Sequence, residues 1–446
     1  MPFRSFLSLV SLALCGPTLL AQAPAPAGFE WGFEERLRSE DWDNLIDHTD
    51  TKADARTQYR LRSRLWSTYR NDSGLEVAAG IVNENRKITR PDTAVYNGRE
   101  VFFETLYVDY HFTPGLSVRV GRQNLMRGEG FVVFDGTAGD GSRSQYFNAV
   151  DLTWAWRKSK LELLAISNPL NDTYLPVLNR IAAPSEKNRL TEWDEQALGV
   201  YFTGKDFAAT QLEAYYFYKT ERNFDRTNKA IYQPDRRFST LGGRAVRDFP
   251  GGWTFTAELA GQRGRQEASD TGTPSKAIRA WGGYGRLKKA LEAPWKPRAS
   301  VAYIGLSGQD PTRTDAITAW NPVFGRWPKW SELYIYSQAP EKGVAYWTNT
   351  GMWELELRCA PLPPLELRAT YYRMAALKPL VAQAGPLFGT GRSRGDLWQL
   401  RADYSFSPAL KGHALYEHLK PGDAYSGRDG GHYLRFEFTY LFKRRL

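Results

Sequence analysis

The sequence has no long hydrophobic run beyond its first twenty residues. Past residue 20 no stretch supplies the roughly 18 apolar residues that a membrane-spanning helix needs, so a helical membrane bundle is excluded. Helical periodicity is also scarce along the chain. Intrinsic disorder is excluded because 14% of the residues are aromatic, and disordered chains are poor in aromatics.

Cysteine is also scarce, with two in 446 residues. Cys15 lies in an N-terminal leader, so the mature chain would keep Cys359 alone and form no disulfide. A secreted protein of this size must then be held together by other means. A closed β-sheet meets this need, because its backbone hydrogen bonds run all the way round and leave no open edge.

The N-terminus has the pattern of a secretory leader. A basic residue precedes the apolar stretch Phe6–Leu20, and Ala25–Ala27 fits a small-x-small cleavage site. Cleavage after Ala21 is the alternative, so the boundary falls between residues 21 and 27. We therefore expect a signal peptide over residues 1–27 and a single domain over residues 28–446.

Arginine strongly outnumbers lysine among the basic residues. The chain has 41 Arg but 18 Lys, with a formal net charge of +10. An arginine excess indicates recognition of carboxylate or phosphate, because the planar guanidinium binds these groups through two parallel hydrogen bonds. Nucleic acid is the first partner to consider for a basic protein. The sequence shows no zinc-ligand spacing, RNA-binding aromatic motif or long Lys/Arg run, so we expect no nucleic-acid partner.

Alternation of period two runs through most of the chain and predicts β-strands. In residues 59–66, Tyr59, Leu61 and Leu65 alternate with three arginines. The same pattern recurs in residues 351–359, 365–372 and 433–442. One parity carries apolar residues and rings, and the other carries charges, often several in a row. Rings near the strand ends would form the aromatic girdles of a membrane barrel.

Turn signals come in two lengths. Eight are short, and they alternate with long polar stretches at 39–56, 168–195, 308–345 and 376–395. This asymmetry is typical of an outer-membrane β-barrel, and eight short turns between two terminal strands give about 18 strands. A soluble β-sandwich would put its charges outside and its rings inside, and a propeller would repeat every ~40–45 residues. The short turns are at Asn71–Gly74, Thr113–Gly115, Arg157–Lys160, Gly204–Asp206, Pro250–Gly252, Pro294–Pro297, Pro361–Pro364 and Pro408–Gly412.

Two stretches of the chain resemble the alginate-export (AlgE-type) family of outer-membrane barrels. The most distinctive part is a Gly-Arg-Gln strand followed by a Phe-Asp-Gly turn, and the similarity covers about residues 29–155. The resemblance implies an 18-stranded barrel in the outer membrane of a Gram-negative-type bacterium, with an Arg-rich, electropositive lumen that passes an anionic polysaccharide outward. The motifs lie at Phe33–Arg38, Tyr59–Leu65, Leu106–Tyr110, Val118–Leu125, Phe134–Gly136 and Asp140–Arg143.

Candidate lumen residues follow from the charged parity of the strands. Arginines there would compensate carboxylates through many moderate sites, and acidic neighbours would hold the guanidiniums in place. The alternative for each arginine is a cross-strand ion pair with no substrate contact. The candidates are Arg60, Arg62, Arg64, Arg358, Arg368, Arg401 and Arg435, with Glu354, Glu356 and Glu437.

Four further candidates lie in the stretch that carries the resemblance. Arg119 and Arg122 share one strand but have opposite parity. Parity favours Arg119 in the lumen, the resemblance favours Arg122, and Gly121 would allow a bulge between them. Asp135 and Arg143 lie in the following loop. They would either fold inward as a constriction or form a bridge that stabilises the loop.

Three functions remain open from the sequence. The first is a channel for an anionic polysaccharide or oligosaccharide, with alginate-like polyuronate export implied by the resemblance. The second is an uptake porin for small organic acids or aromatic carboxylates, and the third is a non-conducting scaffold barrel. Outer-membrane lipid is an expected partner, and an exporter would also take periplasmic secretion partners. No catalytic triad, nucleophile elbow or metal-ligand cluster is present, so we expect no enzyme, metal or cofactor.

Overall fold

The computed structural model describes residues 26–92, 101–134, 146–170, 172–176, 178–179, 193–222, 234–268, 272, 274–380 and 387–446. The expected leader, except for its last two residues, and the candidates Asp135 and Arg143 lie outside these described residues. One short helix, α1 (Tyr334–Ser337), accompanies the strands in the described part. None of the helices in that part is long and apolar enough to cross a membrane.

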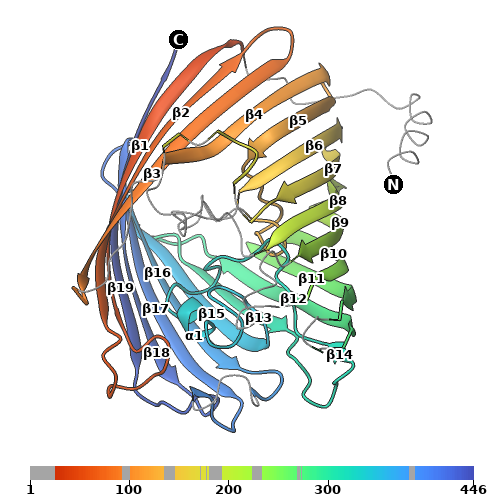
Figure 1. Cartoon of the computed structure of the whole chain (residues 1–446). Coiled ribbons are helices and arrows are strands. Elements are labelled where there is room, and N and C mark those ends of the chain that lie inside the picture. The colour runs from red at the N-terminus through yellow and green to blue at the C-terminus, as the bar shows by residue number, and fades with distance from the viewer. Residues whose placement is uncertain are drawn as a thin grey trace.

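The strands form one closed antiparallel barrel (Figure 1). Each wall strand pairs with its neighbours in sequence, and β1 pairs with β19 to close the sheet. The nineteenth element, β14, has two residues and pairs in parallel with β12, so the described residues give 18 wall strands, as predicted. The strands are β1 Gly28–Asp43, β2 Arg56–Arg70, β3 Leu75–Arg90, β4 Val101–Thr113, β5 Leu116–Gln123, β6 Phe147–Trp156, β7 Ser159–Asn168, β8 Asp194–Phe207, β9 Thr210–Arg222, β10 Arg236–Phe249, β11 Trp253–Gln266, β12 Lys276–Ala290, β13 Arg298–Leu306, β14 Ala316–Ile317, β15 Thr350–Leu362, β16 Leu365–Ala375, β17 Ser393–Ser405, β18 Leu410–Pro421 and β19 Gly431–Arg445.

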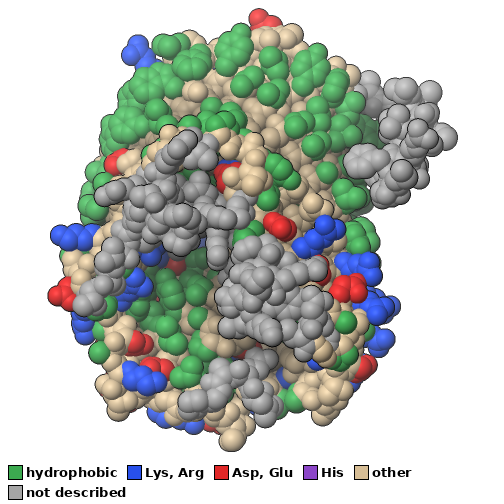
Figure 2. All heavy atoms as spheres, in the orientation of Figure 1, with side chains coloured by type: hydrophobic (Ala, Val, Ile, Leu, Met, Phe, Trp, Pro, Cys, Tyr) green, Lys and Arg blue, Asp and Glu red, His purple; other side chains and the backbone are tan. Residues whose placement is uncertain are grey.

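The alternation of the sequence becomes the two faces of the wall. On β2, Leu65 is 51% exposed on the outer face, whereas Arg60 is 6% exposed on the inner face. On β19, Phe436 and Phe438 face outward and Arg435 is buried inside. Apolar side chains outside and polar side chains inside are the arrangement that a barrel needs in lipid. Figure 2 shows hydrophobic side chains spread over the upper part of the wall with few charges among them.

The connections confirm the predicted asymmetry. Eight short turns lie at one end of the barrel with both chain termini, and the longer connections lie at the other end. One turn is misplaced in the sequence-based prediction. The predicted turn Gly204–Asp206 belongs to β8, which continues to Phe207 through an irregular register, and the turn falls at Ala208–Ala209. The polar triplet Gly-Lys-Asp resembles a turn but is accommodated within the strand.

A long connection folds into the barrel and supplies much of its core. Residues 307–349 join β13 to β15 and include β14, which lies at the edge beside β12, and α1, which lies inside the barrel in Figure 1. We call this connection the inner loop. Trp320, Phe324 and Tyr334 of this loop are almost fully buried and belong to the main hydrophobic cluster. The sequence predicts a long polar loop here, but the structure places its aromatic residues inside.

Candidate functional site

The inner loop is anchored to nearly opposite walls of the barrel. On one side, Nζ of Lys219 on β9 donates to the carbonyl oxygen of Val323 at 2.6 Å. On the other side, the Glu417 carboxylate on β18 accepts from the Ser331 hydroxyl at 2.5 Å and from the Leu333 backbone N–H at 3.0 Å. Because β9 and β18 lie far apart around the ring of strands, the loop crosses the lumen between them. Folded loops of this kind narrow or plug barrel interiors.

A second loop packs against the inner loop. Residues 124–134 follow β5, and Val133 forms a parallel β-bridge with Phe324. The rings of Phe134 and Trp327 stack with their centroids 4.0 Å apart. Nε1 of Trp327 donates to the Gly130 carbonyl oxygen at 3.1 Å. The two loops therefore form one packed unit inside the barrel.

Glu129 links the two packed loops to the barrel wall through ion pairs. Its carboxylate binds Arg244 on β10 at 3.2 Å and Arg286 on β12 at 3.0 Å, and Arg286 also binds Glu354 at 3.2 Å. Burial opposes the charge, but Arg286, Lys329 and Arg244 outweigh it and hold the pKa of Glu129 below its usual range. Lys329 of the inner loop donates to the Glu129 carbonyl oxygen, and burial lowers the pKa of Lys329 to about 8.

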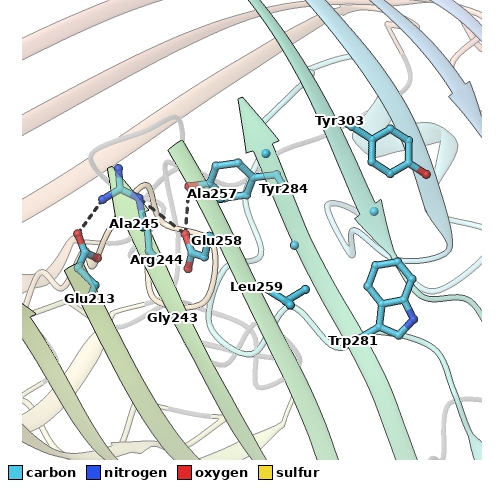
Figure 3. Close-up of a pocket in the computed structure, with 13 residues that line it drawn as sticks. Glu213, Gly243, Arg244, Ala245, Ala257, Glu258, Leu259, Trp281, Tyr284 and Tyr303 are labelled. Carbon is cyan, nitrogen blue, oxygen red and sulfur yellow. Dashed lines mark hydrogen bonds and ion pairs between the residues drawn. The ribbon is translucent and has the colours of Figure 1, made fainter. Parts of the chain in front are cut away.

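The wall beside Glu129 carries a cluster of side chains that are not among the predicted site residues (Figure 3). Arg244 binds Glu213 at 2.7 Å, and its Nε lies 4.0 Å from Glu258. The hydroxyls of Tyr284 and Tyr215 each donate to Glu258 at 3.0 Å. These side chains come from four adjacent strands, β9 to β12. Their alternation is visible in the sequence, but only the strand register brings them together.

The three predicted arginines on β2 all point inward and are all ion-paired. Arg60 binds Glu84 at 2.9 Å, and Arg62 and Arg64 share Glu34 at 2.6 and 3.1 Å. The Arg60 and Arg62 side chains are buried, whereas Arg64 is 22% exposed. Acidic residues of the neighbouring strands therefore neutralise most of the charge in this sector.

Arg435 and Glu437 on β19 belong to the same network. Arg435 binds Glu40 on β1 at 2.8 Å and Glu332 of the inner loop at 2.9 Å. Glu437 binds Arg38 on β1 at 2.5 Å. These pairs join the first and last strands of the barrel where it closes. Arg435 thus holds the inner loop as well as the wall.

Arg119 and Arg122 both lie away from the lipid-facing side. Arg119 binds Asp109 on β4 at 2.7 Å and is 34% exposed. Arg122 is fully buried and binds Asp172 at 2.7 Å. Gly121 between them has φ +128°, a backbone conformation that L side chains rarely adopt. This local break in the pleat allows residues of opposite parity to be sheltered on one strand.

The remaining predicted arginines lie in a single line. Arg298, Arg358, Arg368 and Arg401 are directly opposite one another on β13, β15, β16 and β17. We call these four residues the arginine row. Adjacent strands lie about 4.8 Å apart, so the row extends for about 14 Å around the inner wall. The sequence predicts the parity of the last three but not Arg298 or the alignment, because cross-strand register is not visible in the sequence.

The arginine row is incompletely neutralised. Arg358 binds Glu356 on its own strand at 2.7 Å, and Arg401 binds Asp403 in the same way at 2.7 Å. Glu366 on β16 binds Arg298 and lies 3.6 Å from Arg358. Within the described residues, Arg368 forms no ion pair, although like charges flank it on both sides. Like charges opposite one another in a sheet are unfavourable unless an anion joins them. Among the four arginines of the row, Arg368 is therefore the one without a carboxylate partner in the described part of the chain.

A buried histidine ties the loops together at the long-loop end of the barrel. Nδ1 of His48 donates to the Asn44 carbonyl oxygen at 3.0 Å, and the imidazole packs on Tyr425 with ring centroids 4.5 Å apart. Burial lowers the pKa of His48 to about 4, from 6.5. The neutral form is thus favoured in the folded protein, and its stabilisation is complete above pH 6.5 and lost as the pH falls toward 4.

We expect the loop of residues 44–55 to loosen in acid. The shift corresponds to at most about 3 kcal/mol of local stability. Hydrogen exchange of these amides, corrected for the intrinsic rate, should accelerate between pH 6.5 and 4.5. The His48→Phe variant cannot protonate and keeps the ring contact, so its exchange should not depend on pH in this way. Equal protection of the native loop at both pH values would contradict the assignment.

The fold and the polar interior define a class of protein. A closed barrel of this kind, with an apolar outer face and loops folded into its lumen, is an outer-membrane channel. The family model for alginate export matches residues 32–437, and the chain belongs to this family. The family and the solved structures of the same fold are channels and porins rather than enzymes.

Solved structures from Pseudomonas aeruginosa share the architecture. OccK11 (OpdR) has 11% sequence identity and a TM-score of 0.59, covering 95% of this chain and 100% of that chain. OpdK with vanillate has 13% identity and a TM-score of 0.56, covering 93% and 99%. OccK2 (OpdF) in complex with glucuronate has 12% identity and a TM-score of 0.55, covering 94% and 98%. At these identities the similarity shows the fold alone. No curated protein matches the sequence.

Proposed function

We propose that this outer-membrane channel conducts carboxylate-bearing saccharides along the arginine row. The proposal rests on the alignment of four inward arginines, of which Arg368 forms no ion pair within the described residues. A guanidinium binds a carboxylate through two parallel hydrogen bonds and stays charged at all physiological pH values. A polyuronate presents one carboxylate on every ring, so successive rings would meet successive guanidiniums.

The arginine row should bind a substrate carboxylate with moderate affinity. Glu356 and Asp403 already bind Arg358 and Arg401, so a substrate carboxylate must compete with them. Conduction needs sites that are favourable enough to enter and weak enough to leave. Arg368 would supply the attraction, and its paired neighbours would accept and release the same carboxylate in turn. This arrangement suits passage rather than tight storage.

A second candidate is uptake of small organic acids. Two observations favour it. The inner loop crosses the lumen and narrows it, and barrels of the same fold have been solved with vanillate and with glucuronate. A single carboxylate would use the same arginine row, so the two candidates differ in the length of the substrate.

Planar-bilayer recordings test the proposal. In a KCl gradient the reversal potential should show anion selectivity, and oligouronates should block the current at concentrations where neutral oligosaccharides of equal length do not. Block that grows with chain length supports the saccharide channel. Equal block by monomeric glucuronate and longer oligouronates would favour the small-acid channel. Cation selectivity would overturn both candidates, and no conductance in any state would overturn both and favour a scaffold.

A further inference from the structure

Four arginines face outward on β10 to β12 near the long-loop end of the barrel. Arg237 lies directly opposite Arg265, and Arg263 lies directly opposite Arg279. All four are exposed, and they share the parity of Leu241, which is 66% exposed on the outer wall. Like charges in such cross-strand pairs repel one another. The repulsion would be relieved by an anion outside the barrel.

The height of the cluster on the wall matches the edge of the membrane. On β11 the outward apolar run extends from Trp253 to Gly261, and Arg263 is the next outward residue. These eight steps at about 3.3 Å, on a strand tilted by about 40°, cover about 20 Å of membrane, close to the apolar height of such barrels. Trp281 stands one outward position below Arg279 on β12. Arg263 and Arg279 thus lie where headgroups of the outer leaflet begin.

Few carboxylates compensate this charge. Arg237 binds Glu267 at 2.8 Å, and both side chains are exposed. Asp315 lies near β12, where it is bonded to Arg313 at 2.8 Å and also attracts Arg279. Within the described part of the chain, Arg263 has no ion pair. The cluster therefore keeps a net positive charge.

An apolar groove runs down the outer wall from the cluster. A hollow of about 1110 Å³ is lined by Arg263 and Arg279 at its charged end and by Leu241, Gly261 and Trp281 below. A Cβ atom at Gly261 would meet nothing within 4 Å, so the groove is open there.

A second hollow lies further along the wall, toward the other end of the barrel. It has a volume of about 550 Å³ and shares Trp281 with the first. Its outward lining includes Leu259 and Tyr303, drawn in Figure 3, and small residues such as Gly283 and Gly285. Small side chains on three neighbouring strands leave a channel in an otherwise bulky apolar wall.

We propose that this outer face binds a phosphorylated lipid of the outer leaflet, with a phosphate between Arg263 and Arg279 and an acyl chain in the groove below. The charged end requires an anion, and the guanidinium pair offers phosphate two charge-assisted contacts. The apolar end requires a chain rather than a free ion. The site is separate from the arginine row, because it lies on the opposite face of the wall.

Native mass spectrometry of the purified barrel in detergent tests the proposal, with lipid A as the probe. Lipid A should remain bound at micelle conditions that remove a dephosphorylated lipid A. The double variant R263S/R279S should weaken lipid A binding at least about tenfold, since two charge-assisted contacts are lost. Arg247→Ser, an exposed outward arginine at the short-turn end of β10, is the matched control and should bind as the native protein does.

A second variant tests the role of the groove. A Cβ atom at Gly261 meets nothing within 4 Å, so with Gly261→Leu the barrel should fold and keep its conductance while lipid A binding falls. Competition with inorganic pyrophosphate distinguishes a free-anion site, because it should displace little lipid if the acyl chain contributes. Lipid A binding that survives both R263S/R279S and Gly261→Leu would overturn the proposal. So would equal binding of the dephosphorylated lipid.

Discussion

The triple variant R358S/R368S/R401S is expected to lose most of the anion selectivity of the channel. It removes three adjacent guanidiniums from the inner wall and leaves Glu356 and Asp403 uncompensated there. Block by an oligouronate should weaken at least about tenfold, because each lost charge-assisted bond contributes on the order of 1 kcal/mol. The reversal potential in a KCl gradient and the concentration for half-block measure the two effects.

The matched control keeps charge and changes geometry. R358K/R368K/R401K should retain anion selectivity but bind uronates more weakly, because an ammonium cannot form the bidentate pair. Retention of native selectivity and block by the serine variant would show that the row is not on the conduction path. Heat-induced unfolding should confirm that each variant still forms a barrel.

Removal of the inner loop is expected to increase conductance several-fold. Replacing residues 318–346 with a short Gly/Ser linker deletes the segment that crosses the lumen, and an 18-strand wall leaves an aqueous channel when it is not filled. The wall should survive, because its strand pairing does not pass through the loop. Single-channel conductance in symmetric KCl measures the effect.

A milder variant checks the same inference. Glu417→Ala removes the acceptor for Ser331 and Leu333, so one anchor of the inner loop is lost while the loop remains. We expect more frequent opening and closing of the current with a native maximal conductance. Unchanged conductance after loop removal would mean that the inner loop does not limit flow.

The barrel itself could be predicted because alternation is a local property. Each strand shows its two faces in sequence, as Leu65 and Arg60 do on β2, and short turns mark one end of the barrel. The misplaced turn at Gly204–Asp206 shows where local sequence patterns no longer determine the structure. A polar Gly-Lys-Asp triplet is compatible with a turn and with an irregular strand end, and only the neighbouring strands decide between them.

The site could be predicted only in part, because its essential features are not local. Alternation indicates that Arg368 and Arg401 face inward, but their direct alignment depends on the register of β16 and β17. The inner loop has no period, and its inward fold follows from packing against distant walls. Its aromatic residues, such as Trp320 and Trp330, were the available signal, since a solvent-exposed loop rarely carries so many large rings.

We propose above that the arginine row binds substrate carboxylates inside the channel. The most direct measurement is an experimental structure of the barrel with a short oligouronate bound. We expect density for a uronate carboxylate within hydrogen-bonding distance of the Arg368 guanidinium, with a neighbouring ring near Arg358 or Arg401. An oligouronate bound in the lumen with no carboxylate near these three arginines would contradict it.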